Sequence, residues 1–99
     1  MMIYQSPIVS NKRVAYEFQG ETITVHYQDQ QDLFNLSFIG EGYFELFNDD
    51  GSRKFPTSLP FNPIQSVERN DGVLWVKVLY FISQNATEEE RFPDWFEAS

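Results

Sequence analysis

The sequence predicts an all-β fold: a small antiparallel sandwich or partly open barrel of about five to seven strands, with a short C-terminal helical turn. The strongest observation is the stretch 73–82, VLWVKVLYFI, in which nine of ten residues are apolar or aromatic. Both alternating faces of this stretch are mostly apolar, which is typical of a central strand. The second observation is the turn sequence Asn70-Asp71-Gly72 immediately before it. The third is a pair of alternating segments, 13–19 and 22–28, separated by Gly20-Glu21.

The composition indicates one domain, residues 1–99, with more aromatic rings than its core requires. A chain of 99 residues suits a single domain with a modest core. It contains ten Phe, five Tyr and two Trp, each of which covers a large area, so we expect some rings on the surface as a binding face. There is no cysteine, which excludes disulfides, thiolate nucleophiles and cysteine-ligated metal sites.

Charge and hydropathy exclude two classes of partner. The formal net charge of −8 argues against nucleic acid, because phosphate binding requires clustered Lys and Arg. No apolar run approaches the ~18 residues of a membrane span. The N-terminal stretch MMIYQSPIVSNKR lacks the basic-then-apolar order of a signal peptide, so we expect a protein that is cytoplasmic when made. No motif calls for a cofactor, and none is expected.

The first third of the chain is predicted to form strands joined by tight turns. Residues 1–12 contain a short strand that Pro7 restricts to the edge of a sheet. Segments 13–19 and 22–28 form a hairpin, because Gly20 at the first position of a two-residue loop favours a type II′ turn. That loop predicts three apolar pairs on one face, Phe18–Ile23, Tyr16–Val25 and Val14–Tyr27.

The next segments are a polar loop at 28–32 and a strand at 33–39. The strand is the prediction because Phe34, Leu36 and Phe38 alternate, although Leu33, Leu36 and Ile39 would also suit one helical turn. Further strands are predicted at 43–48, 53–55 and 64–69. Three prolines within 56–63 favour an ordered, extended connection between two sheets or barrel edges.

The register of the last hairpin depends on its turn. A two-residue Asp71-Gly72 loop pairs Val67 with Val76 and Ile64 with Leu79, whereas a three-residue turn shifts this register, and both remain open. We expect a buried core formed by ten residues of these strands: Val14, Tyr16, Phe18, Ile23, Val25, Phe44, Leu46, Leu74, Val76 and Val78.

No local pattern points to catalysis or metal binding. His26 is the only histidine, and it is expected on the solvent side of the first hairpin without catalytic or metal-ligating companions. Residues 48–52 resemble a calcium loop, but Leu46 and Thr57 would occupy the first and twelfth ligand positions, so a turn is predicted. Nucleophile, phosphate-loop and zinc motifs are absent. We therefore expect no enzymatic activity.

The acidic, aromatic segment 84–99 is the strongest candidate for a binding site. Thr87 and Glu90 form a capping-box pattern, and Pro93 limits the helix to about one turn. Either the rings pack on their own sheet while the acids stay solvated, or the segment docks on another subunit or partner protein. The candidate protein-binding residues are Glu88, Glu89, Glu90, Phe92, Trp95 and Phe96.

A pattern of prolines and a helix cap carries a family resemblance. Leu59-Pro60 and Asn62-Pro63-Ile64 precede the last hairpin, and residues 87–90, Pro93 and Trp95 follow it. In these positions the C-terminal part of the chain, about a third of its length, resembles small proteins of tailed bacteriophages and prophages, chiefly of Gram-positive hosts. The resemblance implies a tail- or baseplate-associated protein with a role in virion assembly or structure, present in the host cytoplasm or in the virion.

These observations together predict a non-enzymatic structural or assembly protein that binds a protein partner or associates with itself. Two alternatives come from the charge and the rings. An acidic inhibitor that mimics nucleic acid would carry its acids along one face, and a carbohydrate- or ligand-binding β module would present a flat aromatic platform. The distribution of acids and rings over the surface distinguishes the three.

Overall fold

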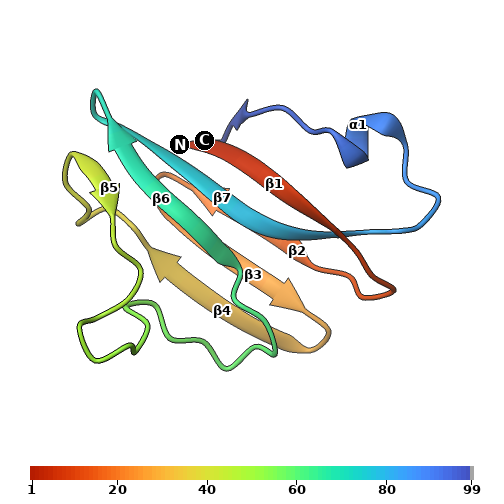
Figure 1. Ribbon diagram of the computed structural model, residues 1–99, viewed down its shortest axis with the longest axis horizontal. Coiled ribbons are helices and arrows are strands. Elements are labelled where there is room, and N and C mark those ends of the chain that lie inside the picture. Colours follow the sequence, from red (N-terminus) through yellow and green to blue (C-terminus); the bar gives the residue numbers. More distant parts are fainter. Residues whose placement is uncertain (99) are drawn as a thin grey trace.

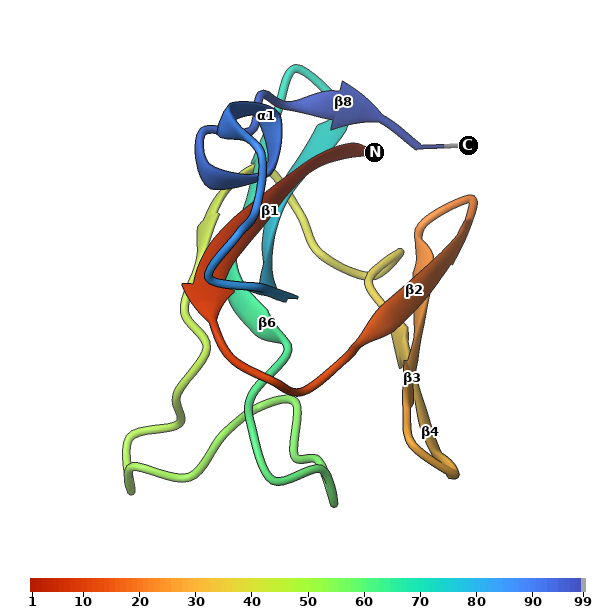
Figure 2. The ribbon, with the colours of Figure 1, turned by 90° about the vertical axis from the view of Figure 1, so that its right-hand side faces the viewer.

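The computed structural model describes residues 1–98 and shows a sandwich of two β-sheets (Figure 1). One sheet has five strands in the order β5-β6-β7-β1-β8, and the other has three in the order β2-β3-β4. Figure 2 shows the smaller sheet facing one side of the larger sheet. The predicted all-β sandwich is therefore confirmed, but residues 1–98 form eight strands instead of the predicted five to seven.

The elements follow the chain with one very short helix near the end. The larger sheet contains β1 (Met2–Val9), β5 (Gly42–Phe44), β6 (Ile64–Asn70), β7 (Val73–Ile82) and β8 (Phe96–Glu97). The smaller sheet contains β2 (Ala15–Gln19), β3 (Thr22–Tyr27) and β4 (Gln30–Asn35), and the helix is α1 (Glu88–Arg91).

The core lies between the sheets and is centred on β7, which β6 and β1 flank as a central strand requires. Seven of the ten predicted core residues are buried, including Val76 and Val78 with no exposed surface. The other three, Tyr16, Phe18 and Phe44, are half-buried and pack against the core. Further buried residues come from segments outside that prediction, such as Ile3 of β1.

Strand β1 differs from the prediction because it pairs parallel with β7. The register runs from Met2 opposite Trp75 to Val9 opposite Ile82. The antiparallel expectation was local, since each predicted hairpin joins neighbours in sequence, whereas β1 and β7 lie at opposite ends of the chain. The strands are thus mostly antiparallel, as predicted, and the β1–β7 pair is the parallel exception among the described residues.

Pro7 nevertheless occupies the position that an edge allows. The Ser10 N–H donates to the Ile82 carbonyl, so Ser10 points its backbone groups toward β7. Because this direction alternates along a strand, the even-numbered residues of β1 point their backbone groups toward β7 and the odd-numbered residues point theirs away. Strand β8 pairs only with Met2 and Ile3, which leaves the outer side of β1 open from residue 4 onward. The missing N–H of Pro7 therefore falls on the open side and costs no ladder hydrogen bond.

Both predicted hairpins form with two-residue turns. Gly20 has φ +60° and the following Glu21 does not have positive φ, as a type II′ turn requires, and Phe18 pairs with Ile23 as expected. Val14 lies before β2, so its predicted pair with Tyr27 is not part of the ladder.

The last hairpin combines a correct turn with a shift in register. Asp71 and Gly72 have φ of +51° and +80°, which fits a type I′ turn, and Val67 pairs with Val76. A bulge between Ile64 and Ser66 places Ile64 opposite Val78 instead of Leu79. The two-residue turn is therefore confirmed, and the Ile64–Leu79 pair is wrong.

The boundaries of β4 and its neighbours also differ from the prediction. Residues 30–32 are not loop but pair with β3, and the strand ends at Asn35, whose side chain accepts a hydrogen bond from the Ser37 N–H at 3.0 Å. Phe38 is consequently exposed, whereas Ile39 is buried. Segment 53–55 makes only an isolated bridge between Arg53 and Phe47, so it is not a strand.

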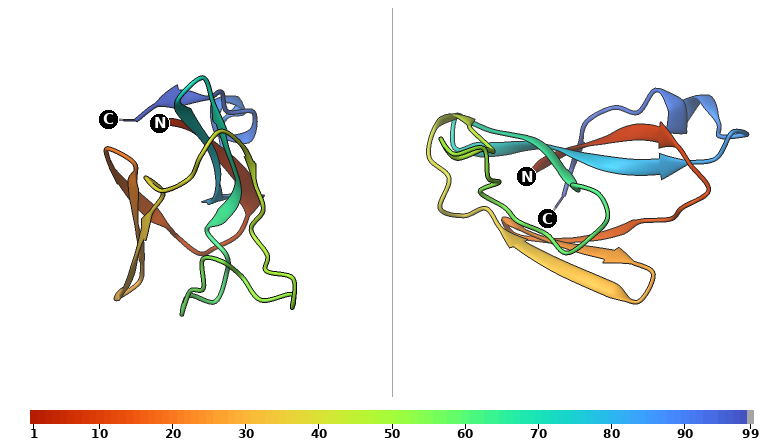
Figure 3. Two further views of the ribbon diagram at one scale, coloured as in Figure 1. Left: turned by 90° about the vertical axis from the view of Figure 1, so that its left-hand side faces the viewer. Right: turned by 60° about the horizontal axis from the view of Figure 1, so that its bottom comes forward.

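The proline-rich segment 56–63 belongs to the connection from β5 to β6, which are neighbours in the larger sheet, so the predicted crossing between two sheets is wrong. The connection runs along the end of the sandwich where the long loops gather (Figure 3). Leu59 is buried within it. The Phe61 ring lies 5.1 Å from the ring of Tyr27 on β3 and 5.1 Å from that of Phe81 on β7. One aromatic side chain of this connection thus contacts both sheets, although the chain returns to the sheet that it left.

Two polar contacts join the sheets elsewhere. The Arg69 guanidinium donates to both carboxylate oxygens of Glu21, at 2.9 and 3.0 Å, and this hydrogen bonding lowers the pKa of Glu21. The Tyr16 hydroxyl donates to the Leu79 carbonyl, and burial raises the pKa of Tyr16 well above its usual value. These contacts fix the relative position of the two sheets.

Candidate functional site

The C-terminal segment forms a projection followed by a clasp. The projection, residues 84–94, carries α1 on the side of the larger sheet that faces away from the smaller sheet (Figure 2). Its predicted capping box is present: the Glu90 N–H donates to Thr87 Oγ1 at 3.2 Å, and the Glu90 carboxylate accepts from the Thr87 N–H at 3.4 Å. No residue of α1 is buried, so Glu88, Glu89 and Glu90 are exposed.

The predicted ring residues divide between these two parts. Phe92 is 77% exposed at the end of α1. Trp95 and Phe96 instead pack on their own domain, Trp95 against the outer side of the larger sheet and Phe96 against Phe18 of β2, 6.2 Å between ring centroids. Ala98 is buried, and its N–H donates to the Met1 carbonyl. The segment is therefore a clasp at residues 95–98 and a solvated projection before it.

Strand register assembles a second surface that we call the outer aromatic face. It comprises the side chains that leave the larger sheet on the side away from the core: Tyr4, Tyr43, Ser66, Glu68, Asn70, Trp75, Lys77 and Trp95. Tyr43 lies opposite Glu68, which lies opposite Trp75, so these three form one row across β5, β6 and β7. Lys77 lies between Ser66 and Tyr4 in the next row.

The rings of this face are held by one another. Trp95 lies 5.2 Å from Trp75 in an edge-to-face arrangement and 5.5 Å from Tyr4. The Lys77 ammonium lies 5.6 Å from the centroid of the Tyr4 ring, a cation–π contact. Tyr43 makes no such contact and is 67% exposed. Three rings are thus packed and one is available.

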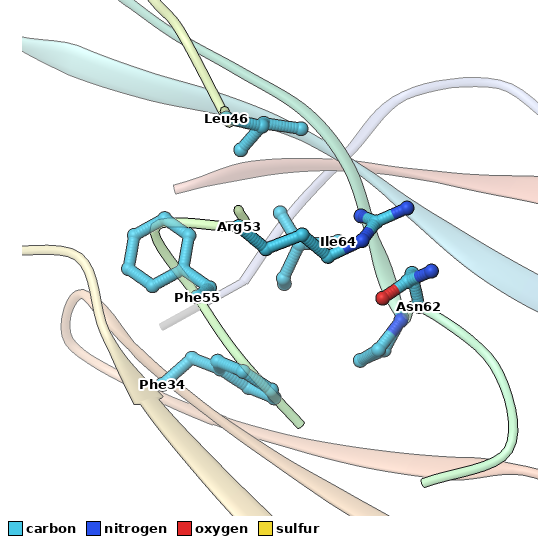
Figure 4. A pocket seen from close by; sticks show the side chains of 7 residues that line it. Phe34, Leu46, Arg53, Phe55, Asn62 and Ile64 are labelled. Atoms are coloured by element: carbon cyan, nitrogen blue, oxygen red, sulfur yellow. The ribbon is translucent and has the colours of Figure 1, made fainter. Parts of the chain in front are cut away.

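A depression of about 510 Å³ lies on this face, lined by Tyr43, Ser66, Glu68, Asn70, Trp75, Lys77 and Trp95. Two further surface depressions have about the same volume, but one has Phe18 as its single ring and the other has no ring. A cavity between the sheets near Phe34 and Ile64 measures only about 10 Å³ (Figure 4), which leaves room for a single water molecule. Among these four hollows of residues 1–98, the one on the outer aromatic face combines a sizeable volume with several rings.

His26 and the turn at residues 48–52 lie apart from both surfaces described above, and His26 contacts one acid. His26 lies on the outer side of the smaller sheet as predicted, with its Nε2 at 2.9 Å from the Glu17 carboxylate and a side chain that is 37% exposed. Residues 48–52 form a turn closed by a hydrogen bond from the Asn48 N–H to the Ser52 carbonyl at 2.7 Å. Within residues 1–98 no three acidic or histidine side chains gather as a metal site would require.

The sequence indicated the projection but missed most of the outer aromatic face. The sequence places Trp75 only within the apolar stretch 73–82, and Tyr4 and Tyr43 belong to segments for which it predicts no neighbouring strand. The one sequence feature that indicates part of this face is the alternation in 73–82, which places Trp75 and Lys77 on the face opposite Val76.

Comparison with protein-family models, with curated proteins and with solved structures gave no significant match. Within the described residues, no helix combines the length and apolar character needed to cross a membrane. The function is therefore inferred from the surfaces described above.

Proposed function

We propose that this protein is a non-enzymatic structural or assembly component, of tailed-phage or prophage type, that binds a protein partner or a second copy through the projection at residues 84–94. The observation that carries the proposal is Phe92, a large ring that is 77% exposed at the C-cap of α1, where its backbone N–H donates to the Glu88 carbonyl. An exposed ring on an ordered support can act as an anchor, because little conformational entropy is lost when it enters a pocket.

The projection is held by its own hydrogen bonds and contributes no buried residue to the core. Its capping box and the hydrogen bond from Arg91 Nε to the Ala86 carbonyl, at 3.2 Å, define the helix, while Ile82 and Ala98 are buried on either side of the segment. The fold therefore presents Phe92 and the three glutamates to solvent. A partner surface with an apolar pocket and a rim of Lys or Arg would complement them.

The distribution of acids favours this function over mimicry of nucleic acid. Glu17 lies on the outer side of the smaller sheet, Glu68 on the outer side of the larger sheet, and Glu88 to Glu90 on the projection. Acids spread over opposite sides do not reproduce the single charged line of a nucleic-acid backbone. The resemblance to phage proteins supports an assembly context for the same surface.

The test compares Phe92→Ser with Leu33→Ser in sedimentation velocity and in binding to purified phage tails or virions of the source strain. Leu33 is a matched control because it is also largely exposed, at 62%, but lies on β4 of the other sheet. We expect the native chain and Leu33→Ser to self-associate or bind the particles and Phe92→Ser to do neither. A native chain that stays monomeric at high concentration and is absent from purified particles would refute the proposal.

A further inference from the structure

The outer aromatic face has a composition that the projection does not share, because rings and polar groups alternate on it. Strands lie about 4.8 Å apart, so the row Tyr43–Glu68–Trp75 places a carboxylate between two rings within roughly 10 Å. Ser66 and Lys77 lie beside this row on one side, and Asn70 of β6 lies beside it on the other side. The resulting hollow of about 510 Å³ is in the range of small-ligand sites.

The rings supply a preorganised apolar platform. Trp75 supports Trp95 edge to face, and Tyr4 contacts Trp95 from the other side, so the two indoles are fixed before any ligand arrives. Tyr43 stands 67% exposed on β5 and forms the opposite wall. The C–H faces of a sugar ring pack against aromatic rings of this kind, since both surfaces are apolar and flat.

The polar side chains of the hollow have unused hydrogen-bonding capacity. Among residues 1–98, the side chains of Ser66, Glu68, Asn70 and Lys77 make no hydrogen bond and no ion pair. Together they offer a hydroxyl, a carboxylate, an amide and an ammonium, hence both donors and acceptors. Sugar hydroxyls both donate and accept, so they match this set. A lipid or an apolar protein surface would leave these groups desolvated and unpaired.

We propose that the hollow of the outer aromatic face binds a neutral oligosaccharide, a binding activity that is independent of the projection. Neutrality follows from the lining, which carries one acid, Glu68, and one base, Lys77. The net charge of −8 also repels polyanionic glycans. Glu68 and Ser66 bind hydroxyls from β6, while Trp75, Trp95 and Tyr43 pack against the sugar faces.

The experiment titrates the ¹⁵N-labelled full chain with millimolar chitohexaose, cellohexaose and maltohexaose and follows the indole N–H signals of its two tryptophans by NMR. We expect saturable shifts of both indole signals with at least one saccharide. Tyr43→Ala should weaken binding about tenfold, as loss of one stacking ring implies. Glu68→Gln should also weaken it, because an amide replaces a charged acceptor. Both positions are exposed, so the variants should remain folded.

Leu33→Ala is the control, since Leu33 is exposed on the other sheet and should leave the affinity unchanged. The proposal is overturned if none of the three saccharides shifts the indole signals, or if Tyr43→Ala and Glu68→Gln bind as well as the native chain. Shifts with decaproline and none with the saccharides would also overturn it and assign the hollow to extended proline-rich peptides.

Discussion

Truncation of Val76 to alanine tests which face of β7 is internal. Val76 has no exposed surface and lies between Val67 of β6 and Ile3 of β1. The substitution removes two methyl groups, at ~0.8 kcal/mol each, and the remaining void adds to this loss. We expect the free energy of unfolding to fall by about 2 kcal/mol, within a range of roughly 1–3, which lowers Tm by on the order of 10 °C in a chain of this length.

The assay is urea unfolding followed by tryptophan fluorescence, with Val73→Ala as the control on the same strand. Val73 is 42% exposed beside the turn, so its truncation should cost less than about 0.5 kcal/mol. An unchanged m value in both variants would show that only the folded state has been altered. Equal losses at the two positions, or a loss near zero at Val76, would put Val76 on the surface and refute the assignment of faces.

Three further predictions concern the sheet contacts and the C-terminal segment. The pKa of Glu21 is lower in the folded state, chiefly through its hydrogen bond from Arg69, so the Arg69–Glu21 contact contributes its full stability above the unfolded pKa and loses it as pH falls through the folded pKa. Urea titrations at several pH values should show that Glu21→Gln loses less stability on acidification than the native chain. Parallel losses would contradict this. Trp95→Ala should lower the calorimetric Tm whereas Phe92→Ser should not, because Trp95 packs on two rings and Phe92 is 77% exposed. A lower Tm for Phe92→Ser than for Trp95→Ala would place Phe92 in the core. Pro7→Val restores an N–H on the open side of β1, where a strand of another molecule could then pair. The variant should therefore increase concentration-dependent light scattering. Unchanged scattering would show that Pro7 does not protect this edge.

The turns were predictable because their chemistry is local. Gly20 and the pair Asp71-Gly72 adopt the positive φ values that their turn types require, and each turn then determines the register of the strands that it joins. The capping box of Thr87 and Glu90 was predictable for the same reason, since both partners lie within one helical turn.

Pairings between distant segments were not predictable from such local patterns. The parallel pair of β1 and β7 joins residues more than seventy positions apart, and its formation depends on the whole chain order. The bulge after Ile64 and the extension of β4 over residues 30–32 depend on the strand opposite. Hydrophobic alternation shows that a segment is a strand, but it does not identify its neighbour.

The candidate sites follow the same division. Local sequence predicted the acidic helix and its rings, but it could not separate Phe92, which is 77% exposed, from Trp95 and Phe96, which contact rings of the sheets. Phe96 remains 39% exposed beside Phe18. The outer aromatic face requires the register of β5, β6, β7 and β1 together before Tyr43, Glu68 and Trp75 come into one row. A site assembled across strands has no continuous sequence motif.

The position of Trp95 determines how the two surfaces can be studied separately. Trp95 follows Phe92 by three residues, yet it lines the hollow and holds the clasp, so its substitution would alter stability and saccharide binding together. Phe92 and Tyr43 are 77% and 67% exposed and contribute little to packing. Because loss of an exposed ring leaves the core intact, Phe92→Ser should affect only protein association, and Tyr43→Ala only the hollow. If the two substitutions affected both activities equally, the projection and the hollow would form one continuous interface.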